Sequence, residues 1–171
     1  DELSTDITLL HGVETNIDAE GDLSTDDDLL EELDVVVASP HAALGQDRGT
    51  ATDRLVRAVD HPSVDILGHP TGRLIAEREG LTPDIERVAA AAADAGTALE
   101  INADPARLDL RGEFVRVAVD AGATIAVDTD AHAPDALDHL RYGVHTARRG
   151  WCESDDLLNT RSAERLRSFL H

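Results

Sequence analysis

The sequence has very little cysteine, few aromatic residues, and no lysine or methionine. Cys152 is the single cysteine among 171 residues, which excludes an internal disulfide and a thiolate cluster for a structural metal. Any metal must therefore bind His, Asp or Glu. Two Phe, one Tyr and one Trp leave few rings for stacking on nucleic acid bases. No apolar run approaches the ~18 residues of a membrane span and no signal peptide opens the chain, so we expect a cytoplasmic protein without membrane contacts.

Positive charge is also scarce, because 15 basic residues, all arginine, face 35 acidic residues for a net charge of −20. This charge repels nucleic acid phosphates at ordinary salt, and the sequence contains no basic DNA-binding face. At molar salt the Debye length falls to ~3 Å and the repulsion is screened. We therefore interpret the acidic, lysine-free composition as halophilic. The length and the 42% of hydrophobic residues suit one domain, or a large piece of one.

Short β-branched runs alternate with alanine-rich amphipathic runs, which predicts an α/β fold with a parallel sheet. We expect strands at 9–17, 35–39, 64–67, 97–102 and 124–128. We expect helices at 26–33, 50–59, 83–95 and 113–121, and a last helical stretch over 135–149, 154–158 and 162–170. Thr82 before Pro83 predicts a helix start, whereas Gly96 and Gly122 predict helix ends. No linker divides the chain.

One polar residue lies in or just after each expected strand. These residues are Glu14, His41, His69, Glu100 and Asp130, separated by 27, 28, 31 and 30 residues. In a βα barrel each unit takes about 31 residues, and functional side chains collect where the strands end. The spacing therefore predicts that these groups meet at one rim, as oxygen and nitrogen ligands for Mn, Zn or Fe.

Each candidate ligand also has an ordinary structural explanation. His41 and His69 directly follow apolar strands and lie next to prolines, a setting that suits ligands better than packing residues. Asp130 and His132 would point the same way in an extended segment, and a helix cap at Asp130 is the alternative. Glu14 lies inside an apolar strand, where its carboxylate needs either a metal or a buried arginine.

Four further residues are candidates for substrate contacts or for support of the ligands. Glu100 and Asn102 share a strand, and the metal-ligand and hydrogen-bonding interpretations of them are equally good. Arg73 and Arg107 lie in loops at the rim and can hold a phosphate through two hydrogen bonds, with surface ion pairing as the alternative.

The ordered motifs of this chain resemble the PHP (polymerase and histidinol phosphatase) domain, in the version at the carboxyl end of bacterial and archaeal family X DNA polymerases. The resemblance covers about residues 9–170, and it rests on GVETNID, ASPHAALGQDR, DILGHPTGRL, ALEINADPARLDL, VDTDAH and RYGVHTARRGW. It implies a seven-stranded, TIM-like βα barrel with up to three divalent metals, Mn or Zn, with Fe or Mg as further candidates.

The resemblance also assigns residues. Glu14 matches the family's bridging carboxylate, His41 and His69 match its later single histidines, and Asp130 with His132 matches its final Asp-x-His pair. Glu14 and Asp130 are the expected catalytic groups. The family's HxH motif and two further early ligands have no counterpart. We therefore expect residues 1–171 to be the carboxyl-terminal part of a PHP domain, with about five βα units and the first two missing. A degenerate domain is the alternative.

The implied activity is metal-dependent phosphodiester hydrolysis at DNA 3' ends, as a 3'-5' exonuclease in DNA repair, with a polymerase domain upstream in the same polypeptide. A phosphomonoesterase of the histidinol phosphatase type, acting on a small phosphoester, uses the same chemistry. A non-catalytic scaffold is a third reading, because an incomplete ligand shell loses geometry and affinity.

Overall fold

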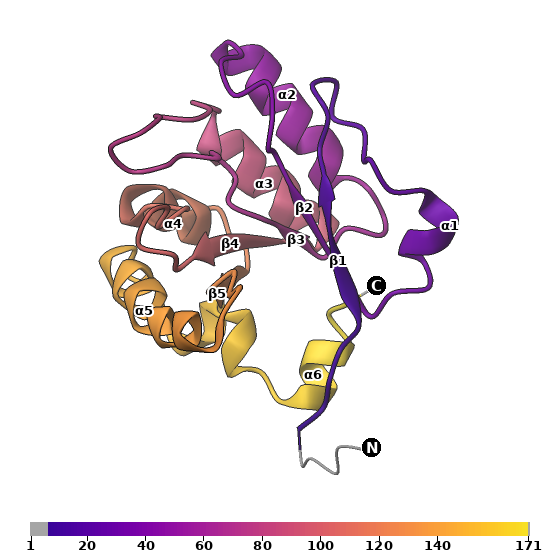
Figure 1. Cartoon of the computed structure of the whole chain (residues 1–171), viewed down its shortest axis with the longest axis vertical. Coiled ribbons are helices and arrows are strands. Elements are labelled where there is room, and N and C mark those ends of the chain that lie inside the picture. The colour runs from indigo at the N-terminus through magenta and orange to yellow at the C-terminus, as the bar shows by residue number, and fades with distance from the viewer. Residues whose placement is uncertain (1–6, 171) are drawn as a thin grey trace.

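The computed structural model describes residues 7–170, which form one parallel five-stranded sheet with helices packed against it (Figure 1). The sheet has the order β1-β2-β3-β4-β5, so each strand pairs with the next one along the chain. The strands are β1 (Gly12–Asn16), β2 (Val35–Ser39), β3 (Ile66–Leu67), β4 (Ala98–Asn102) and β5 (Ile125–Asp128). This arrangement confirms the predicted α/β class and is that of an incomplete parallel βα barrel.

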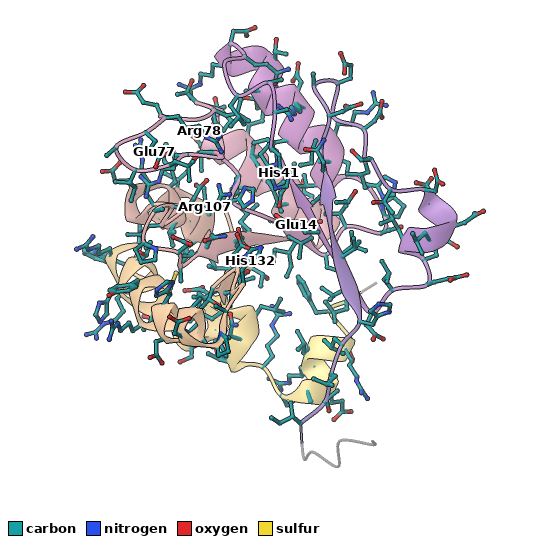
Figure 2. The ribbon with its side chains drawn as sticks, viewed as in Figure 1. Glu14, His41, Glu77, Arg78, Arg107 and His132 are labelled. Carbon is teal, nitrogen blue, oxygen red and sulfur yellow. The ribbon has the colours of Figure 1, made fainter. Side chains whose placement is uncertain are left out.

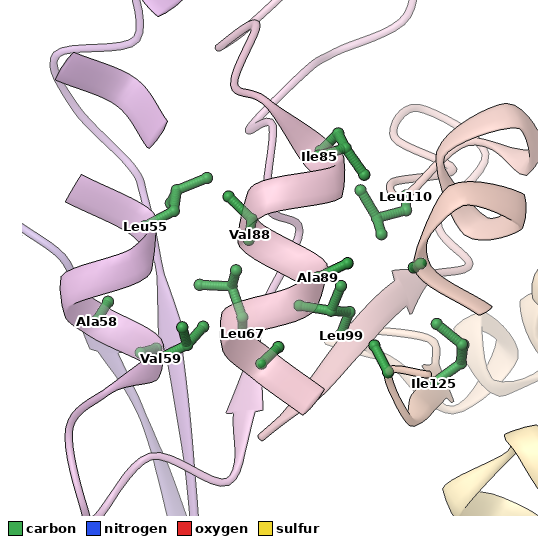
Figure 3. Close-up of a cluster of buried hydrophobic side chains, with 14 of the residues drawn as sticks. Leu55, Ala58, Val59, Leu67, Ile85, Val88, Ala89, Leu99, Leu110 and Ile125 are labelled. Atoms are coloured by element: carbon green, nitrogen blue, oxygen red, sulfur yellow. The ribbon is translucent and has the colours of Figure 1, made fainter. Parts of the chain in front are cut away.

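The connections between strands carry the helices. They are α1 (Asp27–Leu30), α2 (Arg48–Val59), α3 (Ile85–Ala95), α4 (Gly112–Asp120), α5 (Leu140–Arg149) and α6 (Ala163–Arg167), with short 3-10 helices η1 (Pro134–His139), η2 (Ser154–Asp156) and η3 (Leu158–Thr160). Leu55 of α2 and Val88 of α3 bury their side chains in the same core as Leu67 and Leu99 of the sheet (Figure 3). Within residues 7–170, no helix has the length and apolar character needed to cross a membrane.

Several helix boundaries differ from the prediction. The helix expected from Pro83 begins at Ile85, because the Asp84 side chain accepts a hydrogen bond from the Arg87 N–H at 3.3 Å and acts as the N-cap. Its predicted end is confirmed, since Gly96 adopts a left-handed φ of 83°. The stretch from 135 to 149 is not one helix, because η1 precedes α5. The chain enters η1 through Pro134, which has no N–H to donate.

The two edges of the sheet are not equally open. We expect exposed edges near Glu14 and Thr124, and β1 and β5 are indeed the outer strands. At β5, however, Asn159 takes the place of a neighbouring strand. Its Nδ2 donates to the Val127 carbonyl, and its Oδ1 accepts from the Val127 N–H, each at 2.8 Å. The expectation of an open edge is therefore wrong at β5.

Candidate metal centre

Three of the predicted ligands meet at the carboxyl ends of neighbouring strands. Glu14 lies on β1 and His41 comes just after β2 (Figure 2), and His69 comes just after β3. His69 Nε2 is 3.0 Å from Glu14 Oε1, and His41 Nε2 is 3.5 Å from the same oxygen. One ligand atom from each residue lies within 4.8 Å of the others. The structure therefore brings together residues that are 55 positions apart in the sequence.

Close packing between β2 and β3 fixes the position of His69. A side chain at Gly68 would bring its Cβ to 2.2 Å from the Ser39 Oγ, so only glycine allows the two strand ends to approach. His69 itself has a φ of 22°, and its buried N–H donates to the Glu100 carboxyl. The Nδ1 atom of His69 has no hydrogen-bond partner among the described residues.

The protonation states of Glu14 and His41 suit a metal. The hydrogen bond with His69 is the main cause that lowers the pKa of Glu14 to about 2, against the opposing effect of partial burial. Burial also lowers the pKa of His41, although the Glu14 carboxylate opposes this. Near neutral pH, Glu14 is therefore a carboxylate and His41 a neutral imidazole, which are the forms that bind metals. One carboxylate with two imidazoles fits a borderline divalent cation such as Zn or Mn.

Asp130 and His132 lie beside this trio rather than within it. Asp130 has a left-handed φ of 48°, so the expectation of an extended segment at 130–132 is wrong. His132 Nδ1 is 2.7 Å from the backbone oxygen of Asp130, and its side chain is 87% exposed. The Asp130 charge still acts on His41, where it partly opposes the lowering of the pKa by burial. Within residues 7–170 no buried arginine pairs with Glu14. The Glu14 carboxylate faces His41 and His69 instead.

The predicted supporting residues lie around Asp130. Asn102 is buried and donates from Nδ2 to the Asp130 Oδ2 at 3.3 Å, so its hydrogen-bonding role is the one observed. Arg107 Nε is 4.0 Å from the same oxygen, its side chain is only 17% exposed, and its Nη1 is buried without a partner in the described residues. Arg73 Nε donates to the backbone carbonyl of Arg107 at 2.8 Å and forms no ion pair among residues 7–170.

A buried group of acids lies behind the histidines, and sequence reasoning found only one of them. Glu100 is inside the sheet, and burial raises its pKa well above the usual range, helped by the charge of Asp128. Asp109 accepts two hydrogen bonds from Thr71, and burial raises its pKa as well. Asp128 could have been found from the sequence, because it is an acidic residue at the end of an apolar strand.

Comparison with known proteins gives relatives of two kinds, and no family model matches the chain. The chain is 44% identical over 162 residues to the DNA polymerase/3'-5' exonuclease PolX of Bacillus subtilis, which covers 95% of this chain and 28% of PolX. It is 32% identical to a probable phosphatase of Shewanella sp. strain ANA-3, over 96% of this chain and 66% of that protein. A probable phosphatase of Shewanella sediminis is 30% identical, over 96% of this chain and 68% of its own length.

The chain thus spans just over a quarter of PolX and about two thirds of the phosphatases. The parallel βα sheet, the ligands at its carboxyl ends and these two groups of hydrolytic enzymes agree with one another. The chain belongs to the PHP (polymerase and histidinol phosphatase) family of hydrolases.

Proposed function

We propose that this chain forms part of a metal-dependent phosphoesterase that hydrolyses phosphodiesters at DNA 3' ends, acting as a 3'-5' exonuclease in DNA repair. The observation that carries the proposal is the convergence of Glu14, His41 and His69 on one point. The 44% identity to a protein named as a polymerase and 3'-5' exonuclease favours DNA as the substrate. We further propose that a polymerase region elsewhere in the polypeptide supplies most of the DNA contacts.

In this proposal Glu14, His41 and His69 hold Mn or Zn, and Asp130 and His132 complete the site. A divalent metal held by these residues would lower the pKa of a water molecule and would neutralise charge on the phosphoryl oxygens. Glu14 is ionised and presents two oxygens, so it suits a bridging role. Arg107 lies near Asp130, and its Nη1 has no hydrogen-bond partner within residues 7–170, which supports a role for this side chain in binding a phosphate oxygen.

A phosphomonoesterase acting on a small substrate is the second candidate. The relatives named probable phosphatases, at 30 to 32% identity over most of this chain, favour it. Both candidates share the metal chemistry, so the difference lies in what binds outside the reacting phosphate.

Metal content and two substrates test the proposal. We would purify the full polypeptide that contains this chain without chelator, measure bound metals by mass spectrometry, and assay a 3'-labelled single-stranded DNA beside a small aryl phosphomonoester. We expect bound Mn or Zn, removal of nucleotides from the DNA 3' end, and a loss of at least about a hundredfold in activity in Glu14→Gln. The control is Glu32→Gln, which removes an exposed carboxylate.

The alternatives give different results. Preference for the monoester would favour the phosphatase. Absence of both metal and hydrolysis in the folded full polypeptide that contains this chain would overturn the enzyme proposal and favour a scaffold.

A further inference from the structure

A groove of about 700 Å³ lies between the loop after β3 and the beginning of α4. Its volume falls in the range of ~300–1,000 Å³ that is usual for sites of small organic ligands. The residues that matter for its chemistry are Thr71, Arg73, Ile75, Arg78, Arg111 and Phe114. No candidate ligand of the metal centre lines it, so the groove is a separate surface.

Hydrogen bonds to the next loop hold this groove in shape. The Ile75 N–H donates to the carbonyl of Ala106 at 2.6 Å, and the Arg73 guanidinium donates to two carbonyls of the same loop. Within the groove loop, Leu74 and Arg78 exchange backbone hydrogen bonds of 3.0 and 2.9 Å. The groove is therefore largely formed before any ligand arrives, which reduces the entropy lost on binding.

The groove brings three arginines together in a chain whose net charge is −20. Arg73 and Arg78 form no ion pair with a carboxylate anywhere in residues 7–170, and only Arg111 has one, with Glu113 at 3.2 Å. Two glutamates, Glu77 and Glu79, also line the groove, so with Arg111 paired to Glu113 the other two arginines equal these acids in number. An anion is therefore a better ligand here than on the surrounding acidic surface.

The groove also offers apolar and aromatic surface beside the arginines. The Arg111 guanidinium lies 4.0 Å from the centre of the Phe114 ring, and Ile75 is 47% exposed. An arginine stacked on an aromatic ring is a common platform for a nucleic acid base. A ligand that combines phosphates with sugars and flat bases would use both kinds of surface.

Arginines connect the groove with the metal centre. Arg78 and Arg73 line the groove, and the Arg73 guanidinium contacts the backbone of Arg107, whose own side chain reaches Asp130. Figure 2 shows Arg107 between Arg78 and His132. Thr71 of the groove wall is two residues from His69. A chain of phosphates could follow this path to the metal ligands.

We propose that the groove binds the sugar-phosphate backbone of a single DNA strand next to the nucleotide that is removed. Arg73 and Arg78 contact its phosphates, and Phe114 with Arg111 contacts a base. This proposal rests on the proposed function and deepens it, because a groove for neighbouring nucleotides serves a DNA 3' end and is useless to a small phosphomonoester.

Binding without catalysis tests the groove. We would measure fluorescence anisotropy of a labelled ten-nucleotide oligothymidylate in EDTA, with the chain in excess. Arg78→Ala should weaken binding about tenfold and reduce the slope of log K against log salt by about 0.7, the value for one lost contact with a single strand. Phe114→Leu should weaken binding about fivefold and leave that slope unchanged, because it removes stacking only. Arg148→Ala is the control, since it removes an exposed arginine outside the groove.

The outcomes separate this proposal from the proposed function. If wild-type chain fails to bind the oligonucleotide, or Arg78→Ala and Arg148→Ala bind equally, the groove proposal is overturned even where hydrolysis is normal. If thymidine monophosphate displaces the oligonucleotide at the same concentration as a ten-nucleotide competitor, the groove is a small-anion site and the strand proposal is also overturned. Binding with the expected losses supports the groove, whether or not the wild type hydrolyses DNA.

Discussion

At the scale of single residues, Glu100 shows how a buried acid supports a metal ligand. Its carboxyl accepts the hydrogen bond of the His69 N–H and also lies against Asp128. Burial raises the pKa of Glu100 well above its usual range, and its carboxyl shares a hydrogen bond with Asp128. We therefore expect it to act on His69 through shape and hydrogen bonding.

This role predicts a difference between two substitutions of Glu100. Glu100→Gln keeps the size and the acceptor for His69, so we expect the free energy of unfolding to change by less than about 1 kcal/mol. Glu100→Ala leaves a cavity and a buried N–H without an acceptor, and we expect a loss of about 2–4 kcal/mol. Urea denaturation followed by circular dichroism measures both. Equal losses for Gln and Ala would show that the charge matters.

We predict that the thiol of Cys152 is unreactive in the folded protein. Burial is the main cause that raises its pKa to about 11, and the charge of Asp156 adds to it. At pH 8 only about one thiol in a thousand is then ionised. We expect slow alkylation by iodoacetamide until the pH approaches 11, with normal reactivity in urea, where the unfolded chain restores the usual pKa. Half-maximal alkylation near pH 8.5 in the folded protein would contradict this.

At the scale of elements, β5 and η3 form an unusual edge. Asn159 pairs with both backbone groups of Val127 in the manner of another strand, and Leu158 packs on Ala98 and Ala126. An unpaired edge of a parallel sheet invites association with another chain. The short η3 helix therefore covers backbone that would otherwise be open.

Removing the Asn159 side chain tests this cover. Asn159→Ala leaves the Val127 N–H and carbonyl without their partners, and we expect the free energy of unfolding to fall by about 1–3 kcal/mol. We also expect association that increases with protein concentration, measured by light scattering. Asp155→Ala, an exposed position in η2, is the control and should have little effect on either. A monomeric variant of unchanged stability would show that the cover is dispensable.

The comparison of elements also shows what sequence patterns can and cannot predict. Apolar β-branched runs place all five strands, and the order of those strands places Glu14, His41 and His69 together. Predicted helix boundaries are wrong where a side chain caps the helix at another position, as Asp84 does at the start of α3. The left-handed turn at Asp130 and the pairing of Asn159 depend on contacts between distant segments, which no local pattern contains.

At the scale of the whole molecule, the charge distribution is the dominant feature. The chain carries 35 acidic residues against 15 arginines, and several surface acids, among them Glu32, Glu86 and Asp94, have no ion pair within residues 7–170. Repulsion among such groups opposes the compact state. Salt reduces this repulsion because the Debye length falls from about 10 Å at 0.1 M to about 3 Å at 1 M.

We therefore predict that potassium chloride stabilises the folded chain. Between 0.1 and 1 M we expect the melting temperature, measured by circular dichroism, to rise by about 5 °C or more, which corresponds to roughly 2 kcal/mol for a chain of this length. A variant with Glu32→Gln, Glu86→Gln, Asp94→Asn and Asp155→Asn should melt higher at 0.1 M and gain less from salt, because it has four fewer charges to screen. A general effect of salt on burial of apolar surface would stabilise both proteins equally. Equal stability of the wild type at low and molar salt would remove the argument for a halophilic surface.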